Sequence, residues 1–332
     1  MRRFLKWFLI VIVLVVCLIY GYGYYRSFRT PGSSYSGQLD PLDNFQSRVR
    51  DHLKEHVTTL AGQIGERNVP HYDKLEAAAS YIRNYLQQND YQVKEDDYSV
   101  NGKTCRNLYV ELAGSDRSRG VLVVGAHYDS VHGAPGADDN GSGVAAVLEL
   151  ARIMKNDAPT QSILFAFFPN EEPPYSNTDD MGSLQFARGL KRDYMQITGM
   201  ISIETIGYYS DQPGSQHYPS HVASFYPNTG NFIGFVSDLH SRALMHRAIA
   251  AFRSSTHFPS EGAALPSSTR GISWSDHWSF WQIGVPAIMV TDTAPFRNPY
   301  YHTVNDTAEK LDYDRMARVV VGLKHVVEDL TQ

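Results

Sequence analysis

Short apolar runs alternate with segments of helical periodicity along most of the chain, and this alternation limits the fold more than any other feature. Runs such as 120–127 and 162–169 contain no charged residue, which is typical of strands that are buried on both faces. The segment 314–330 carries an apolar stripe at the spacing of one helix face. The pattern therefore predicts an α/β fold in which helices cover both faces of a sheet.

The predicted elements can be placed along the chain. Strands are expected at 91–100, 106–114, 120–127, 162–169, 199–207 and 285–292. Helices are expected at 73–88, 142–154 and 314–330. Either Asn140 or Ser142 is expected to cap the second of these helices.

The N-terminal segment predicts a membrane anchor. Residues 7–25 carry no charge and are long enough to cross the hydrocarbon core of a bilayer as a helix. Trp7 at one end and several tyrosines at the other stand where interfacial aromatic residues are expected, and basic residues precede the segment. We therefore expect an uncleaved anchor in residues 1–25, with the rest of the chain on the extracytoplasmic side. The alternative is a cleaved signal peptide, for which 21-GYG-23 is a poor cleavage site.

The composition of residues 26–332 predicts a linker followed by one domain, and it argues against a nucleic-acid partner. Residues 26–44, rich in Ser, Gly and Pro, are predicted to be a linker that precedes a single domain over 45–332. A net charge of −5 with 42% hydrophobic residues is typical of a globular protein, so no nucleic-acid partner is expected. The two cysteines, Cys17 and Cys105, lie on opposite sides of the linker, so the domain has no disulfide of its own. Nothing in the sequence favours a particular oligomeric state.

Acidic residues and histidines gather where the predicted strands end. The stretch 125-GAHYDSVHGAPGADDNGSG-143 contains two histidines and three aspartates but no lysine or arginine. Later strands end in, or are followed by, Glu171, Glu172, Glu204, Asp292 and His302. Because ligands gather at the carboxyl ends of strands in such sheets, these side chains are expected to converge on one rim. Carboxylates this close repel one another unless a positive charge lies among them.

Metal ions are the positive charges that suit these side chains. His127 and Asp129 are separated by one residue, so on a strand they face the same side. A metal-ligating histidine commonly donates its second ring N–H to a carboxylate, which Asp129 offers. The glycine-rich loop 133–143 returns Asp138 and Asp139 to the same rim. Nitrogen and carboxylate ligands suit zinc, so the sequence predicts two zinc ions at this position.

Five segments resemble, in order, the landmark motifs of the zinc aminopeptidases of metallopeptidase family 28. They are 125-GAHYDSVHGAPGADDNGSG-143, 170-NEE-172, 203-IETIG-207, 275-SDHWSFWQIGVPA-287 and 301-YHTVNDT-307. The resemblance spans residues 120–312 and implies a central mixed, mostly parallel sheet of about eight strands flanked by helices. It also implies a co-catalytic zinc pair and a peptide substrate that is cut at its N-terminal bond.

The resemblance assigns the metal ligands to particular residues. It makes Asp139 the bridge between both zinc ions, and it implies a cis peptide bond between Asp139 and Asn140. Two further residues complete the protein ligands of each ion: His127 and Glu204 for one, Glu172 and His302 for the other. His277 is the alternative to His302.

Other residues are expected to act beside the metals. The resemblance makes Glu171 the general base, and Tyr301 matches a tyrosine that hydrogen-bonds the developing oxyanion in some members. Asp129 and Asp276 are expected to support the metal-binding side chains without binding metal themselves.

This chain departs from the family pattern in two places. Glu204 stands where the family usually has an aspartate, and its extra methylene moves the carboxylate outward. The segment 173–181 is longer than the usual connection and is expected to shape the substrate pocket. Two alternatives stay open: a glutaminyl cyclase, which shares the fold but uses a single zinc, and a membrane receptor or scaffold that has lost its metals.

Overall fold

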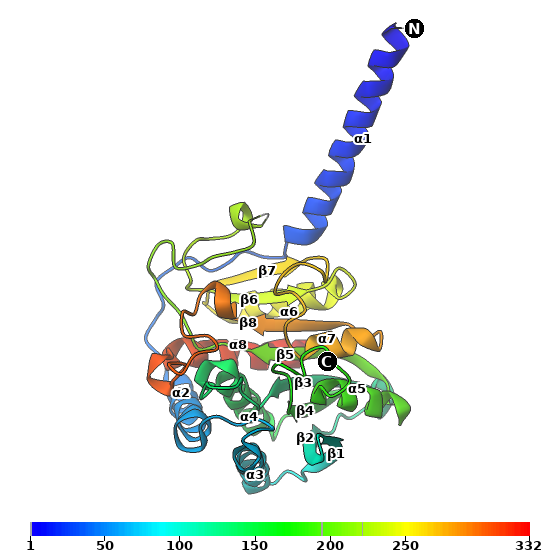
Figure 1. Cartoon of the computed structure of the whole chain (residues 1–332). Coiled ribbons are helices and arrows are strands. Elements are labelled where there is room, and N and C mark those ends of the chain that lie inside the picture. Colours follow the sequence, from blue (N-terminus) through cyan, green and yellow to red (C-terminus); the bar gives the residue numbers. More distant parts are fainter. Residues whose placement is uncertain (1, 194, 221) are drawn as a thin grey trace.

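The computed structural model describes the chain except for residues 1, 194 and 221, and it places an α/β domain at the end of a long N-terminal helix (Figure 1). In the described residues, eight strands form one sheet in the order β1-β2-β4-β3-β5-β8-β6-β7. The strands are β1 Lys94–Val100, β2 Lys103–Leu112, β3 Val121–His127, β4 Ser162–Phe168, β5 Ile197–Glu204, β6 Ile233–Ser237, β7 Ser260–Ala264 and β8 Ala287–Thr291.

The sheet is mixed, as the sequence predicts. Strands β4, β3, β5 and β8 run parallel to their neighbours in the centre, whereas β1 and β2 are antiparallel additions at one edge. At the other edge β6 is antiparallel to β8, and β7 is parallel to β6. Every residue of β3 and β4 is buried, which explains their continuous apolar sequence. The carboxyl ends of the four central strands consequently meet at one rim.

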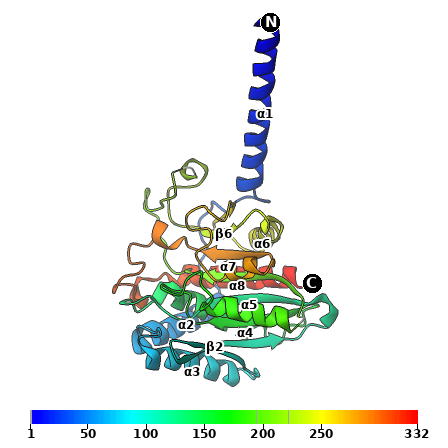
Figure 2. The same cartoon turned by 45° about the vertical axis from the view of Figure 1, so that its right-hand side comes forward.

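Helices cover both faces of the sheet (Figures 1 and 2). One face packs mainly against α2 Asn44–Val57, α3 Tyr72–Gln88, α4 Gly143–Met154, α6 Arg242–Ser255 and α8 Tyr313–Leu330. The other face packs against α5 Gly182–Arg192 and α7 His277–Gln282. The apolar stripe of α8 is buried from Met316 to Leu330, as its periodicity predicts. The predicted fold is confirmed.

The sequence analysis missed the strands β6 and β7 and the helices α2, α5, α6 and α7. The strand β6 has the sequence IGFVS and β7 has SEGAA, so each has only five residues, and β7 contains none of the bulky residues that favour strands. Their positions come from pairing rather than from a local pattern, since β6 pairs with β8 and β7 pairs with β6.

Helix α1, Arg2–Phe28, extends away from the domain (Figures 1 and 2). Its stretch Lys6–Gly23 is long and apolar enough to cross a membrane, and none of it is buried against the domain. The residues after α1 pack along the edge strand β7. The Arg253 guanidinium donates to Thr30 Oγ1 at 2.9 Å and to the Pro31 carbonyl at 2.8 Å, and Ser34 Oγ accepts the Ser260 N–H at 3.0 Å.

Candidate active site

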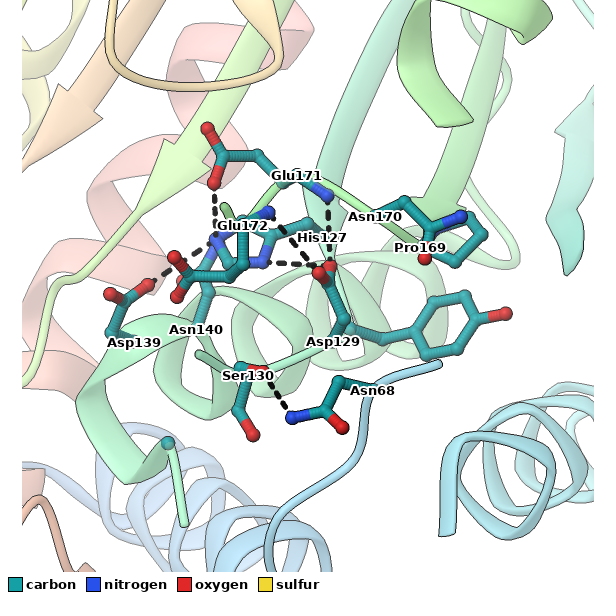
Figure 3. A network of polar contacts seen from close by, with 12 residues as sticks. Asn68, His127, Asp129, Ser130, Asp139, Asn140, Pro169, Asn170, Glu171 and Glu172 are labelled. Atoms are coloured by element: carbon teal, nitrogen blue, oxygen red, sulfur yellow. Dashed lines mark hydrogen bonds and ion pairs between the residues drawn. The ribbon is translucent and has the colours of Figure 1, made fainter. Parts of the chain in front are cut away.

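The first histidine of the site, His127, lies at the end of strand β3 (Figure 3). His127 is fully buried, and its Nδ1 lies 3.3 Å from Asp129 Oδ1. The same carboxylate accepts the backbone N–H groups of Glu171 at 3.1 Å and Glu172 at 3.2 Å, just after β4. Asp129 therefore holds the imidazole and the acidic pair in one arrangement, and it leaves His127 Nε2 facing the rim.

Two clusters of ligand atoms meet at Asp139. His127 Nε2 lies 3.3 Å from Asp139 Oδ1 and 3.2 Å from Glu204 Oε2. His302 Nε2 lies 3.0 Å from Asp139 Oδ2 and 3.2 Å from Glu172 Oε2. Zinc bonds of about 2.0–2.1 Å in a tetrahedral site place ligand atoms about 3.3 Å apart, so both clusters match the spacing that zinc requires.

The hydrogen-bond pattern also fits metal ions. Among the described residues, His127 Nε2, His302 Nε2 and Glu172 Oε1 are buried and have no hydrogen-bond partner. Buried polar atoms are normally paired, since an unpaired one has lost its water without compensation. Nitrogen and carboxylate atoms converging in this way are a donor set for zinc.

Burial opposes the ionisation of Asp139, but His127 and His302 outweigh it and lower the pKa of that carboxyl. Two other carboxylates of the rim are not compensated in this way. Burial and the charge of Asp139 raise the pKa of Glu172 to about 8. Burial raises the pKa of Glu204 to about 7, although the nearby His127 opposes this shift. Both values mean that the ionised form needs a further cation to be stable at neutral pH. Divalent ions would supply that charge.

The loop between β3 and α4 presents only one of its two adjacent aspartates to the metals. The peptide bond from Asp139 to Asn140 is cis, as the resemblance implies. Asn140 Oδ1 accepts the N–H groups of Gly143 at 3.0 Å and Thr205 at 3.1 Å, so Asn140 rather than Ser142 caps α4. Asp138 points elsewhere, and its Oδ1 accepts the Gly207 N–H at 2.8 Å.

Glu171 lies beside the clusters without belonging to either. Its Oε2 is 3.9 Å from His127 Nε2, farther than the carboxylates that share that nitrogen. Burial raises the pKa of Glu171 well above its ordinary value, with the charges of Glu204 and Glu172 adding to the effect against that of His127. A carboxyl group placed next to a metal pair, but outside its ligands, is suited to accept and return a proton.

Three other residues singled out in the sequence, Tyr301, Asp276 and His277, belong to neither cluster. The Tyr301 ring stacks on the His302 imidazole, with centroids 3.8 Å apart and planes 14° apart. Asp276 is fully buried, but neither of its oxygens hydrogen-bonds another described residue. Its neighbour Ser275 instead donates to Glu204 Oε2 at 2.7 Å. His277, the alternative to His302, lies in neither cluster, and its Nε2 is 2.7 Å from the Ile272 carbonyl.

Sequence reasoning missed Arg67 and Asp306, which hold the metal-binding loop. Arg67 is fully buried and donates to the carbonyls of Tyr128 at 2.7 Å and Gly136 at 2.8 Å. Asp306 accepts the N–H groups of Asp138 at 2.9 Å and Asp139 at 3.1 Å. Arg67 offers no sequence signal, whereas Asp306 falls inside the motif 301-YHTVNDT-307 that the resemblance includes.

An apolar cavity of about 110 Å³ adjoins the site. Glu204 and Tyr301 line its end nearest the clusters, and strands β6, β7 and β8 contribute the rest of its floor. The segment 173–181, which the sequence predicts to shape the substrate pocket, does not line this cavity. A pocket that is mostly apolar and lies next to a polar centre is the usual form of a small-molecule or side-chain binding site.

Two clusters that share one aspartate at the carboxyl ends of parallel strands define a two-metal hydrolase. The sequence comparisons assign its family. The chain matches the model described as Peptidase family M28 over residues 107–327 and belongs to that family. It is 36% identical to the uncharacterized protein YfbL of Escherichia coli (strain K12) over 282 residues, which cover 82% of this chain and 86% of that protein. It is 28% identical over 234 residues to a probable leucine aminopeptidase of Arthroderma otae, covering 65% of this chain and 55% of that protein.

Solved structures share the fold. BSAP, a zinc aminopeptidase from Bacillus subtilis, matches with a TM-score of 0.66 at 14% identity, over 85% of this chain and 95% of that chain. A glutaminyl cyclase from Fimbriiglobus ruber matches with a TM-score of 0.63 at 18% identity, over 89% of this chain and 98% of that chain. The family match confirms the predicted class, a metallo-aminopeptidase, and the solved structures confirm the fold.

Proposed function

We propose that the protein removes N-terminal residues from peptides with a pair of zinc ions. The observation that carries this proposal is Asp139, whose two carboxylate oxygens each face a separate histidine in two complete ligand clusters. Zinc held by His127, Asp139, Glu172, Glu204 and His302 would lower the pKa of a bound water and polarise the substrate carbonyl.

The chain's own residues would perform the proton transfers. Glu171 takes the proton from the attacking water and later gives it to the leaving amine, since it lies beside the ligands without being one of them. The Tyr301 hydroxyl donates a hydrogen bond to the oxyanion, and stacking on His302 fixes the orientation of its ring. Asp129 keeps His127 and the backbone of Glu171 in register throughout.

The proposed substrate has a free N-terminus. The α-amino group is positively charged at neutral pH, and the acidic rim offers it a complementary environment. Tyr218, Tyr226 and Trp274 contribute to the wall of the cavity next to the clusters, and this cavity would hold one side chain of the substrate, as an exopeptidase requires.

We further propose that α1 anchors the enzyme in a membrane with the domain on the extracytoplasmic side. The span Lys6–Gly23 is apolar and unburied, and basic residues precede it. Protease added to intact cells or spheroplasts is expected to degrade the domain, and membrane fractions are expected to retain the full chain. A shortened, freely soluble mature chain would instead identify the segment as a signal peptide.

The proposed activity is tested with the full chain in detergent. Aminoacyl-arylamides and peptides with free or acetylated N-termini are assayed with and without chelator, while bound zinc is measured. We expect two zinc ions per chain, cleavage only of free N-termini, and loss of activity on chelation that zinc restores. Absence of zinc would favour a metal-free receptor, and conversion of N-terminal glutamine to a cyclic product without peptide cleavage would favour a glutaminyl cyclase.

A further inference from the structure

One row of residues crosses the sheet beneath the apolar cavity. In the strand registers, Glu204 pairs with Thr291, Thr291 with Gly234, and Gly234 with Glu261. All four residues line the cavity. Three strand spacings of about 4.8 Å separate the Cα atoms of Glu204 and Glu261 by about 14 Å. The cavity thus has a metal ligand at one end of the row and a second carboxylate at the other.

The space between the two carboxylates is apolar and open. Val236, Ala263 and Met289 contribute to its floor from three adjacent strands. Gly234 lies in the middle of the row, and a Cβ there would sit only 3.1 Å from the Thr291 carbonyl oxygen. Without a side chain at this position, a long unbranched group can extend across the floor from Glu204 towards Glu261.

Glu261 has no cationic partner of its own. Among the described residues, no Lys, Arg or His nitrogen lies within 4.0 Å of its carboxylate. Arg253 is the cation that most affects it, but the guanidinium donates to Thr30, Pro31 and Ser260. Burial raises the pKa of Glu261, and neither Arg253 nor Ser34 fully offsets that effect. A half-buried carboxylate without a paired cation is destabilising unless a ligand completes the pair.

The other cation at the cavity is engaged elsewhere. Arg270 is exposed, and its guanidinium lies 5.6 Å from the Trp274 ring centroid and 6.0 Å from that of Phe296. These cation–π contacts hold it against aromatic residues of the lining rather than against Glu261.

We infer that this cavity binds the side chain of the substrate's N-terminal residue and that Glu261 selects lysine or arginine at that position. The inference rests on the proposed aminopeptidase function. A lysine side chain combines an apolar stem, which suits the floor, with a terminal ammonium that pairs with Glu261. Leucine fills only the part of the cavity near the metal clusters, and alanine does not reach the acid.

Lysine and norleucine arylamides test the inference, because the two side chains share a four-carbon stem and differ in the terminal charge. The wild-type enzyme is expected to favour lysine in kcat/KM by about ten- to a hundredfold, mainly through KM. Glu261→Gln should remove that preference while leaving norleucine within about twofold. Asp179→Asn and Asp180→Asn are the control variants, since both acids are exposed and lie outside the cavity, and both variants should keep the preference.

Equilibrium binding keeps this test separate from that of the catalytic proposal. Lysinamide and norleucinamide are titrated by calorimetry into the zinc-loaded wild type and into Glu261→Gln, with thermal unfolding and zinc content as checks on folding. Selective lysinamide binding that Glu261→Gln abolishes supports the inference even if no arylamide is cleaved. Equal binding of both amides to the wild type, or a lysine preference that survives Glu261→Gln in the folded variant, overturns it. Zinc-loaded enzyme without hydrolysis would overturn the catalytic proposal alone.

Discussion

Helix α4 and the rim of the sheet both bury carboxylates, but they neutralise them in different ways. The Glu149 side chain on α4 is fully buried, and Arg152 donates to its two oxygens at 2.8 Å each. His52 Nδ1 lies 3.1 Å from the same carboxylate, and the Tyr85 hydroxyl donates to it at 3.0 Å. Burial opposes ionisation, but Arg152 and His56 outweigh it and lower the pKa of Glu149 to about 2.

The rim contains more acids and no arginine bonded to them. Burial raises the pKa of Glu172 to about 8 and that of Glu204 to about 7, so the two groups shift in the opposite direction from Glu149. Arg67 is buried nearby, but its hydrogen bonds go to backbone carbonyls. A buried acid paired with cations of the chain supports the fold, whereas several buried acids that converge without such partners mark where a cation can bind. Glu261 likewise lacks a paired cation of the chain, and its cation would come from the substrate.

The largest expected effect is on kcat, and it separates the role of Glu171 in proton transfer from the role of the other rim residues in metal binding. Glu171→Gln should lower kcat by about a thousandfold, because amide replaces the group that accepts and returns the proton. Both zinc ions should remain bound, since Glu171 lies outside the two clusters. Steady-state kinetics and zinc analysis on the same sample check both points. The control is Glu149→Gln on α4, for which kcat should stay near wild type. Near-normal turnover of Glu171→Gln would show that Glu171 is not the general base.

Removing the metals should lower the stability of the folded protein, because the rim acids then lose the cations that neutralise them. Zinc binds the folded state selectively, and at a thousandfold excess over its Kd this stabilises the protein by about 4 kcal/mol. Calorimetry is expected to show a lower Tm in chelator and recovery when zinc is returned. An unchanged Tm in zinc-free protein would mean that the rim acids are neutralised by the chain after all, and the comparison would fail.

Acid titration should reveal the stabilising role of Glu149. Its pKa falls from 4.5 to about 2 on folding, so between these values the unfolded state binds more protons than the folded state. This contribution, about 3 kcal/mol, is complete above pH 4.5 and is lost as the pH falls towards 2. Urea unfolding of chelator-treated protein across this range measures it without interference from zinc. Glu149→Gln should flatten the dependence, and an unchanged slope would assign the effect to other groups.

The sequence predicts the central strands of the sheet better than the edge strand β7, and the reason is physical. The runs that became β3 and β4 are buried on both faces and are therefore continuously apolar, and the ligands follow them because ligands lie at strand ends. Strand β7, SEGAA, carries no such pattern, since its place depends on pairing with β6.

Supporting residues were harder to predict than ligands. The guanidinium of Arg67 bonds carbonyl oxygens 61 and 69 positions away in the sequence. Ser275 reaches Glu204 across 71 positions. Such contacts are created by the tertiary structure, and neither residue type at these positions departs from what a surface loop would contain. Glu261 likewise acquires its importance only through the strand register that aligns it with Glu204.

The smallest effect concerns the contact between the end of α1 and the cavity wall. The Phe28 ring at the end of α1 lies 4.3 Å from that of Phe225 and 5.9 Å from that of Tyr226, by ring centroids. Tyr226 lines the cavity, and its hydroxyl donates to the Gly262 carbonyl on β7 at 2.9 Å. Phe28→Ala removes an aromatic contact of about 1 kcal/mol, so KM for long side chains should rise two- to fivefold at constant kcat and zinc content.

Tyr35 provides the matched control for this contact. Its ring stacks on His257 with centroids 4.9 Å apart, and Tyr35 lies in the segment that follows α1, but neither residue lines the cavity. Tyr35→Ala should therefore leave KM unchanged, and Phe28→Leu should restore most of the loss in Phe28→Ala. If both alanine variants raise KM equally, the two residues act through general stability, and the apolar end of the cavity is independent of α1. If only Phe28→Ala does so, the end of α1 contributes to substrate selection at the end of the cavity farthest from the metals.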